Sequence, residues 1–464
     1  MSDTSLADKA LGSEPVGKLL VRLSIPAITA QIVNMLYNIV DRIYIGHIPG
    51  VGAPALTGVG VCMPIIMIIS AFAALVSMGG APRASIFMGR QDKESAQRTL
   101  GNCFILQIII SLVLTVVVVA WNGQFLMAFG ASANTVGYAH SYLTVYALGT
   151  IFVQLTLGMN AFITAQGFAA TSMLTVCIGA VCNIILDPLF IFGFHLGVAG
   201  AAVATVISQA VSTVWVLLFL CGKKSVLRLN PRTFMLSPKI ILPCLGLGFA
   251  PFTMQASESF IFICFNSSLL KYGGDIAVGA MSICTSIIQF GLLPLNGLGQ
   301  GAQPVTSYNF GAKNVQRVKR TFRLLFTASM IYAVSVWLLV MLFPGMFARI
   351  FTSDETLIPF TAKALRIYCG AMFIFGIQTS CQMTFVAIGS AVSSVLVAVM
   401  RKFVLLLPFI YALPALSRAG AGILPVDRTT AVYMAEPVAD ILAVTFTAIL
   451  FTVQFKKAVK GLSD

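Results

Sequence analysis

The feature that most restricts the fold of this chain is its succession of long apolar runs that carry no charge. Residues 103–120 and 211–221, for example, contain no Asp, Glu, Lys or Arg. A helix needs about 20 mainly apolar residues to cross the roughly 30 Å hydrocarbon core of a bilayer. Only 9% of all residues are charged and 58% are hydrophobic, which is too little charge to cover a soluble protein of this size. We therefore predict an all-α integral membrane protein.

The apolar runs divide the chain into twelve predicted transmembrane helices in two lobes of six. The expected helices are 18–46, 55–88, 99–120, 136–166, 168–194, 197–220, 239–271, 275–308, 320–343, 358–388, 390–416 and 429–456. The corresponding domains are a lead-in over 1–17, a first lobe over 18–221, a linker over 222–238, a second lobe over 239–456 and a tail over 457–464.

Basic residues set the expected orientation. Most of the 29 Lys and Arg residues fall in the N-terminal lead-in, the linker, the C-terminal tail and the connections that follow the second and eighth helices. Cytoplasmic segments collect Lys and Arg, so we expect both termini in the cytoplasm. This distribution explains the net charge of +14 without a nucleic-acid partner.

The sequence contains an internal repeat with a constant offset of 222 residues. The segment GGAPRASIFMG, which begins at Gly79, aligns with GAQPVTSYNFG, which begins at Gly301, and the offset continues without a gap to Ser172 and Ser394. The two copies are six helices apart, which is an even number, so the two lobes should have the same orientation relative to the membrane. Parallel repeats of this kind are typical of transporters that bind cargo between their lobes.

A stripe of polar residues marks the first helix. At about 100° per residue, Gln31, Asn34, Asn38 and Asp41 fall within a narrow arc. In the fifth helix, Asn183 and Asp187 share one face because they are four residues apart. Ionisable groups at membrane depth are costly and usually functional. Their oxygen atoms suit H⁺ or Na⁺, with Asp41 and Asp187 as the candidate Na⁺ ligands, although such a cluster could also serve only to hold helices together.

The second lobe carries a different set of polar residues. Gln255 and Glu258 lie in the seventh helix, Gln289 in the eighth and Gln378 in the tenth, and we expect them to line a cargo cavity. The repeat places neutral residues at the positions equivalent to Asp41 and Asp187, so ion coupling should belong to the first lobe. Three further charged residues, Glu436, Asp440 and Arg401, lie either inside the membrane or near the headgroups, and Arg401 could balance one of the two acids.

Known enzyme motifs are absent from the sequence. It has no G-x-x-x-x-G-K-[ST] and no H-E-x-x-H, and it lacks the aspartate-rich pairs that hold metal diphosphates. We therefore expect no catalytic residues and no cofactor other than the coupling ion.

Five segments together resemble the multidrug and toxic compound extrusion (MATE) transporters, in particular the DinF-like and MepA-like members. They are YNIVDRIYIGH, NIILDPLFIFG, AGAAVATVISQ, GGAPRASIFMG and GQGAQPVTSYNFGAKN. The resemblance covers essentially the whole chain. It implies twelve helices in two lobes and the export of organic cations in exchange for H⁺ or Na⁺.

The resemblance also implies a cation site in the first lobe. Asp41, Asn183, Asp187 and Thr205 match it by motif, and Asn160 is expected as a neighbour. Glu258 matches an acid that NorM-type members keep in the seventh helix. The acid that those members keep in the tenth helix is missing here, so the resemblance favours branches with the first-helix aspartate.

The resulting hypothesis is a monomeric secondary active exporter of small organic cations in a bacterial or archaeal cytoplasmic membrane. In this hypothesis Glu258 attracts cationic cargo. The sequence leaves open a flippase for lipid or polysaccharide precursors, an integral membrane enzyme, and a receptor or channel. A flippase would need several basic residues in its cavity, for which Arg401 and Lys402 are the main candidates.

Overall fold

The computed structural model describes residues 10–417 and 422–463, and its regular elements are helices. In the first half of the chain they are α2 (Val16–Gly46), α3 (Gly52–Gly89), α4 (Lys93–Ala120), α5 (Asn122–Ala128), α6 (Val136–Leu148), α7 (Thr150–Ala165), α8 (Ala169–Pro188), the π-helix η1 (Leu189–Gly193) and α9 (Gly197–Cys221). The linker contains the short η2 (Pro231–Thr233). The second half has α10 (Pro238–Gly311), α11 (Val315–Leu342), α12 (Pro344–Phe351), α13 (Leu357–Tyr368), η3 (Met372–Ile374), α14 (Phe375–Ala387), α15 (Ala391–Val399), the π-helix η4 (Met400–Leu406), α16 (Leu407–Leu416) and α17 (Arg428–Ser463).

The described residues contain twelve membrane spans. Nine helices are long and apolar enough to cross a bilayer, and two bent helix pairs, α6 with α7 and α13 with α14, raise the number to eleven. One of the nine, α10, has 74 residues and would be about 110 Å long if it were straight. It contains non-helical backbone at Gly274, with φ 66° and ψ −165°, a conformation open mainly to glycine. Because the chain reverses at Gly274, α10 supplies two spans, and the prediction of twelve is confirmed.

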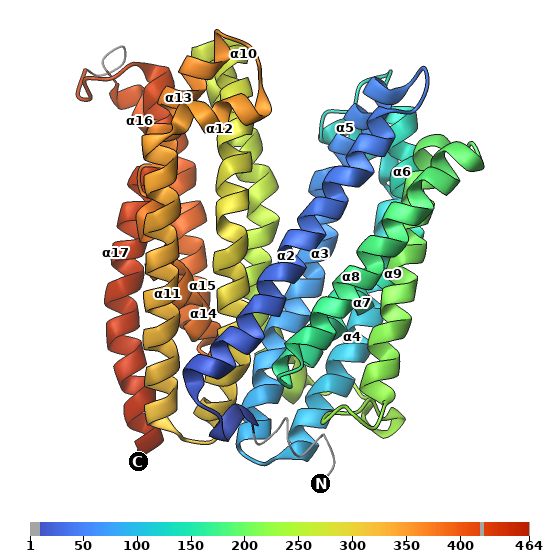
Figure 1. Ribbon diagram of the computed structural model, residues 1–464, viewed down its shortest axis with the longest axis vertical. Coiled ribbons are helices and arrows are strands. Elements are labelled where there is room, and N and C mark those ends of the chain that lie inside the picture. The colour runs from blue at the N-terminus through green and yellow to red at the C-terminus, as the bar shows by residue number, and fades with distance from the viewer. Residues whose placement is uncertain (1–9, 418–421, 464) are drawn as a thin grey trace.

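Figure 1 shows the spans as two bundles, with α2–α9 in one and α10–α17 in the other. The predicted all-α membrane fold with two six-helix lobes is confirmed. The lobes meet where the first part of α10 packs along α3 and the second part packs along α2. Each lobe also has a hydrophobic cluster of its own, and a third cluster contains residues of both lobes.

Local structure repeats with the same offset of 222 residues as the sequence. Asp92 and Asn314 are the N-cap residues of α4 and α11, and the side chain of each accepts a hydrogen bond from the backbone N–H three residues later. The short helices α5 and α12 begin at Asn122 and Pro344, which are also 222 residues apart. The predicted repeat is therefore visible in caps and helix starts as well as in residue identities.

The two copies touch each other at equivalent glycines near the ends of α3 and α10. A methyl group added at Gly89 would overlap the carbonyl oxygen of Tyr308, and one added at Gly311 would overlap the carbonyl oxygen of Ile86. Gly89 corresponds to Gly311 and Ile86 to Tyr308 under the offset of 222. The contact is thus symmetric about an axis between the lobes, and it requires the backbones to approach more closely than any side chain allows.

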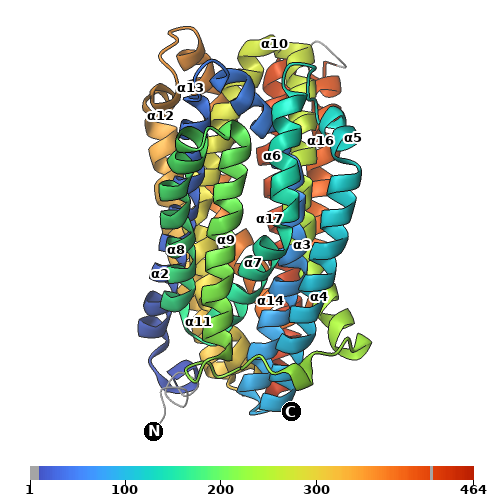
Figure 2. The same cartoon turned by 90° about the vertical axis from the view of Figure 1, so that its right-hand side faces the viewer.

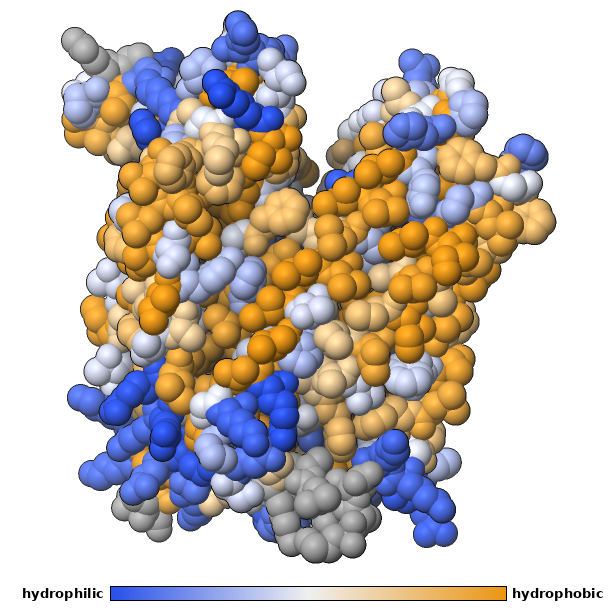
Figure 3. All heavy atoms as spheres, in the orientation of Figure 1, coloured by the Kyte–Doolittle hydropathy of each residue, from blue (hydrophilic) through white to orange (hydrophobic). Residues whose placement is uncertain are grey.

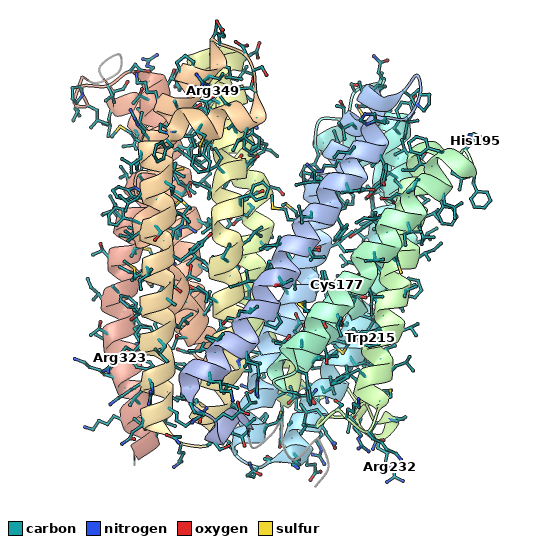
Figure 4. All side chains as sticks on the ribbon, viewed as in Figure 1. Cys177, His195, Trp215, Arg232, Arg323 and Arg349 are labelled. Carbon is teal, nitrogen blue, oxygen red and sulfur yellow. The ribbon has the colours of Figure 1, made fainter. Side chains whose placement is uncertain are left out.

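The lobes are joined at one end of the molecule and separated at the other. Figure 2 shows that the start of α2 and the end of α17 lie at the same end, and in Figure 3 the space-filling surface is hollowed between the lobes at the opposite end. We call this hollow the groove. Arg349 and His195 lie near the tips of the two lobes, His195 on the outer side of the first lobe, whereas Arg232 and Arg323 lie toward the joined end (Figure 4).

Leu11 connects the two lobes at the joined end. Its side chain is fully buried in a hydrophobic cluster that contains residues of both lobes. Its carbonyl oxygen accepts hydrogen bonds from Asn309 Nδ2 at 2.9 Å and from Arg317 Nη2 at 3.0 Å, both in the second lobe. Part of the predicted N-terminal lead-in is therefore packed structure, while residues 1–9 lie outside the described residues.

Four features depart from the sequence prediction. The predicted helix 136–166 is broken at Gly149, where α6 and α7 meet at 56°, and the predicted helix 358–388 is bent by 43° between α13 and α14. The short helices α5 and α12 were not predicted, since each has only seven or eight residues. Neither bend has a proline, which is the usual sequence sign of a kink.

Candidate functional site

The first-lobe acids meet as predicted, although they are far apart in the sequence. Asp41 on α2 and Asp187 on α8 are 6% and 0% exposed, and their carboxyl groups lie within hydrogen-bonding reach of each other. Asn183 Nδ2 donates to Asp187 Oδ1 at 3.1 Å and approaches Thr205 Oγ1 at 3.4 Å. Thr205, which was expected only from the family resemblance, is therefore part of the same cluster. We call these four residues the carboxyl site.

Three oxygen atoms of the carboxyl site lack a hydrogen-bond donor among the described residues. They are Asp41 Oδ1, Asn183 Oδ1 and Asp187 Oδ2, and all three are buried. Buried oxygens without a donor cost free energy. Two ionised carboxylates in contact would also repel each other by about 4 kcal/mol at an effective dielectric constant of 20. A proton or a small cation between them removes both penalties, so the geometry fits H⁺ or Na⁺.

A small cavity of about 40 Å³ leads to this site from between α2, α7, α8 and α9, and its walls include Asn34, Tyr37, Asn183 and Thr205. This volume exceeds the 10–15 Å³ that one water needs. Asn34, from the polar stripe of the first helix, therefore lines a cavity large enough for water.

Two tyrosines near the carboxyl site were not predicted. Tyr37 lies close enough to both acids to interact with them electrostatically. The hydroxyl of Tyr142 is a hydrogen-bond neighbour of Thr205, and its ring stacks on Tyr146 with centroids 6.3 Å apart. Tyrosines are common in apolar helices, so nothing in the sequence distinguished these two.

The other predicted first-lobe residues donate hydrogen bonds to groups outside the carboxyl site. Asn38 Nδ2 donates to the Asn34 carbonyl within the same helix at 2.6 Å. Gln31 Nε2 instead reaches Gln300 Oε1 in the second lobe at 3.3 Å. Asn160 Nδ2 donates to the carbonyl of Ser172 at 3.2 Å, and that residue precedes Asn183 by about three turns of α8. The structure therefore does not bring Asn160 to the carboxyl site as the resemblance implied.

The second-lobe acids are paired with basic residues. Lys402 Nζ lies 2.7 Å from Glu258 Oε1, so Glu258 does not present the unpaired negative charge that the sequence suggested. Arg401 Nε lies 2.7 Å from Asp440 Oδ1 and its Nη2 lies 3.3 Å from Glu436 Oε1. Both of those acids are buried inside the lobe, and Arg401 balances them as the sequence allowed.

The three glutamines expected to line the second lobe differ in their surroundings. Gln378 on α14 is 5% exposed, and neither its Oε1 nor its Nε2 has a partner among the described residues. Gln255 is half-buried and Gln289 is exposed, both on α10. Only Gln378 therefore offers buried polar atoms for a ligand or a water molecule.

An apolar cavity of about 500 Å³ lies between α10 and the span formed by α15 and η4. Its walls are formed by Phe249, Phe252, Thr253, Ala256, Ser257, Phe260, Val399 and Phe403. The volume falls in the range of small-molecule sites, 300–1,000 Å³. Its aromatic walls suit flat apolar molecules.

The family model described as MatE matches residues 26–189 and 252–412, well over half of the chain. The chain belongs to the MatE family. Transporters of the MATE family are in general not enzymes.

Curated relatives within the family carry the name "Multidrug export protein MepA". The protein from Staphylococcus haemolyticus (strain JCSC1435) is 25% identical over 361 residues, which cover 78% of this chain and 79% of the relative. The protein from Staphylococcus aureus (strain N315) is 24% identical over 363 residues, covering 78% and 80%. The MepA-like resemblance of the sequence is thereby confirmed.

Solved structures of MATE proteins share the fold. One described as "Outward-facing conformation of a multidrug resistance MATE family transporter of the MOP superfamily" superposes with a TM-score of 0.88 at 24% identity and covers 99% of both chains. A MOP superfamily transporter from Pyrococcus furiosus, 25% identical, covers 97% of this chain and 98% of its own with a TM-score of 0.85. The match extends over the whole MatE chain, both lobes included.

Proposed function

We propose that this MatE protein is a secondary active multidrug exporter that exchanges organic, often cationic, compounds for H⁺ or Na⁺. The observation that carries the proposal is the buried contact between Asp41 and Asp187, with unsatisfied oxygens on both. A proton or Na⁺ stabilises that contact, and its departure leaves two carboxylates that repel each other. The ion therefore has different affinities for arrangements of the first lobe in which the two acids are together or apart, and such differential affinity is what coupling requires.

The proposal includes the placement of the protein in its membrane. We expect it in a bacterial or archaeal cytoplasmic membrane with both termini in the cytoplasm, because the basic residues gather at the joined end. The groove then opens to the outside, in the direction of export. We expect the exporter to act as a monomer, since each lobe contributes to one shared groove.

The flippase alternative receives no support. A flippase for diphosphate precursors would need basic groups free to meet an anion. Both candidates, Arg401 and Lys402, are instead engaged by carboxylates. The named relatives are multidrug export proteins.

Transport into vesicles tests this function directly. Purified protein in vesicles should move ethidium under an imposed H⁺ gradient or an imposed Na⁺ gradient, applied separately. Asp41→Asn should abolish the response to the effective gradient while leaving ethidium binding in detergent within about threefold of wild type. If Asp41→Asn vesicles accumulated ethidium as fast as wild type under that gradient, the coupling role of the carboxyl site would be refuted.

A further inference from the structure

Five charged side chains from three spans form a network inside the second lobe. Glu258 comes from α10, Arg401 and Lys402 from η4, and Glu436 and Asp440 from α17. Their ion pairs span 35 to 144 residues of sequence. The guanidinium of Arg401 also lies over the Phe375 ring, 5.2 Å from its centroid. We call these five residues the charge network.

The charge network has three carboxyl groups and two basic groups, so it carries one negative charge in excess when all five groups are ionised. Arg401 serves both Glu436 and Asp440, whereas Lys402 makes its ion pair with Glu258 alone. A buried group of charges with a net charge of −1 favours the arrival of one further positive charge. The charge network can therefore accept one monovalent cation without acquiring a net positive charge.

The Glu258–Lys402 pair is covered on one side and open on the other. The side chain of Lys402 is 4% exposed and that of Glu258 is 50% exposed. The residue after Glu258 faces the first lobe, since Ser259 Oγ lies 3.5 Å from Met67 Sδ on α3. The pair thus lies on a helix that borders the first lobe, and a molecule that reaches the exposed side of Glu258 can approach its carboxylate but not the ammonium of Lys402.

The π-helical segment explains how consecutive residues serve different acids. In η4 (Met400–Leu406) each turn contains an extra residue, so Arg401 and Lys402 are both directed into the lobe. Single π-helical turns are often found at functional sites. The positive charge of Lys402 also acts on Glu436, so a second acid lies within its electrostatic reach.

We propose that Lys402 is an internal substitute for cationic cargo: its ammonium occupies Glu258 in the empty transporter, and the positive group of a cargo molecule displaces it. The displaced ammonium turns toward Glu436 and Asp440, where the excess negative charge compensates it. Glu258 is then the subsite of the groove that binds the positive group of the cargo. Because Lys402 competes for Glu258, it sets the minimum affinity that a cationic cargo needs in order to be transported. This inference rests on the proposed function and names the residue that regulates its cargo site.

The charge of a cargo molecule should determine whether it displaces Lys402 from Glu258. A monovalent cation replaces one ammonium by another positive group, so Glu258 remains paired throughout. A neutral molecule cannot displace Lys402, and it binds only through its apolar surface. The pair therefore acts as a filter for positive charge at a site that already contains its own counter-ion.

Equilibrium binding to the purified full-length protein tests the inference with two similar aryl probes. Tetraphenylphosphonium is a cation, and triphenylphosphine oxide is neutral. Lys402→Gln removes the internal competitor, so tetraphenylphosphonium should bind about tenfold more tightly, as expected for one close charge pair, while the oxide should change less than twofold. Lys402→Arg keeps the charge and should retain wild-type affinities. Lys319→Gln, an exposed lysine on α11, is the matched control and should alter neither probe.

A double variant keeps the test decisive if Lys402→Gln alone folds poorly. Glu258→Gln/Lys402→Gln removes both charges, and it should lose most of the preference for the cation over the oxide. Unchanged or weaker binding of tetraphenylphosphonium to folded Lys402→Gln would overturn the inference, as would a full cation preference in the double variant. Binding requires no gradient, so vesicles that fail to transport while these affinities shift would refute the proposed function and leave the subsite standing. Normal transport with unshifted affinities would refute only the subsite.

Discussion

Replacing Gly89 with alanine should force the lobes apart at their joined end. The added Cβ would lie closer than 3.0 Å to the backbone carbonyl of Tyr308, a separation that Cβ atoms do not show. A backbone oxygen cannot rotate away as a side chain can, so α3 and α10 must separate. Overpacking of this kind costs about 1–3 kcal/mol. The arrangement that is open at the groove should therefore lose about 5- to 150-fold in population relative to one in which this contact is broken.

Matched variants separate this effect from helix propensity. Gly311→Ala meets the carbonyl of Ile86 in the symmetric contact, so it should shift the population in the same direction. Gly60→Ala lies on the same helix as Gly89, but no atom lies within 4 Å of its added Cβ. It should be neutral or stabilising by up to about 1 kcal/mol, because alanine favours helix over glycine.

Electron–electron distance measurements between the lobe tips provide the assay. Spin labels at Arg349 and His195, in a background without native cysteines, report the separation of the two lobe tips (Figure 4). The main distance should shift to shorter values in Gly89→Ala and Gly311→Ala and stay unchanged in Gly60→Ala. Identical distance distributions in all three variants would show that the close contact does not control the arrangement of the lobes.

Four further outcomes follow from contacts described above. Asp187→Asn should abolish ion-driven dye transport, because it removes one of the two carboxylates that hold the ion; equal transport rates in vesicles would contradict this. Arg401→Gln leaves two buried acids without their partner and should cost about 3–5 kcal/mol, visible as a large fall in Tm, whereas an unchanged Tm would mean that the acids are solvated. Arg317→Gln removes a donor to the Leu11 carbonyl and should shorten the tip-to-tip distance, with no change expected if Leu11 does not join the lobes. Asp92→Ala should cost about 1 kcal/mol of unfolding free energy by loss of the α4 cap. Hydrogen bonds from Ser95 lower the pKa of Asp92, so the stabilisation by Asp92 is present above pH 4 and is lost as the pH falls through the lowered pKa. A Tm difference between wild type and Asp92→Ala that persisted below that pKa would contradict the assignment.

The sequence predicted the spans and the two acids of the carboxyl site because both depend on periodicity and on the cost of charge in lipid. Long uncharged runs require membrane helices, and Asp41 and Asp187 stood out because such positions are rarely ionisable. The hydrogen-bond partners of the polar residues were harder to predict from the sequence. Asn38 shares the arc of Asp41, yet it bonds to its own helix, since periodicity gives the face of a residue but not the length or direction of its side chain.

Contacts between distant spans could not be predicted in the same way. Glu258 and Lys402 are separated by 144 residues, and nothing in their local patterns indicates that one would neutralise the other. The position of Lys402 also depends on the π-helical turn of η4, which has no recognised sequence sign. Tyr37 and Tyr142 were missed because a tyrosine near a buried acid looks like any tyrosine in an apolar helix.

The symmetric contact of Gly89 and Gly311 has a consequence for how such a chain could originate. Two identical six-helix halves with the same orientation would form this contact as a two-fold homodimer, in which each glycine meets the same carbonyl on its neighbour. In such a dimer every substitution appears twice, so both halves must carry the same charges. Fusion of the halves into one polypeptide removes that restriction. It permits one half to acquire two buried acids while the other acquires a network of five charged groups, a difference between the halves that no symmetric pair can encode.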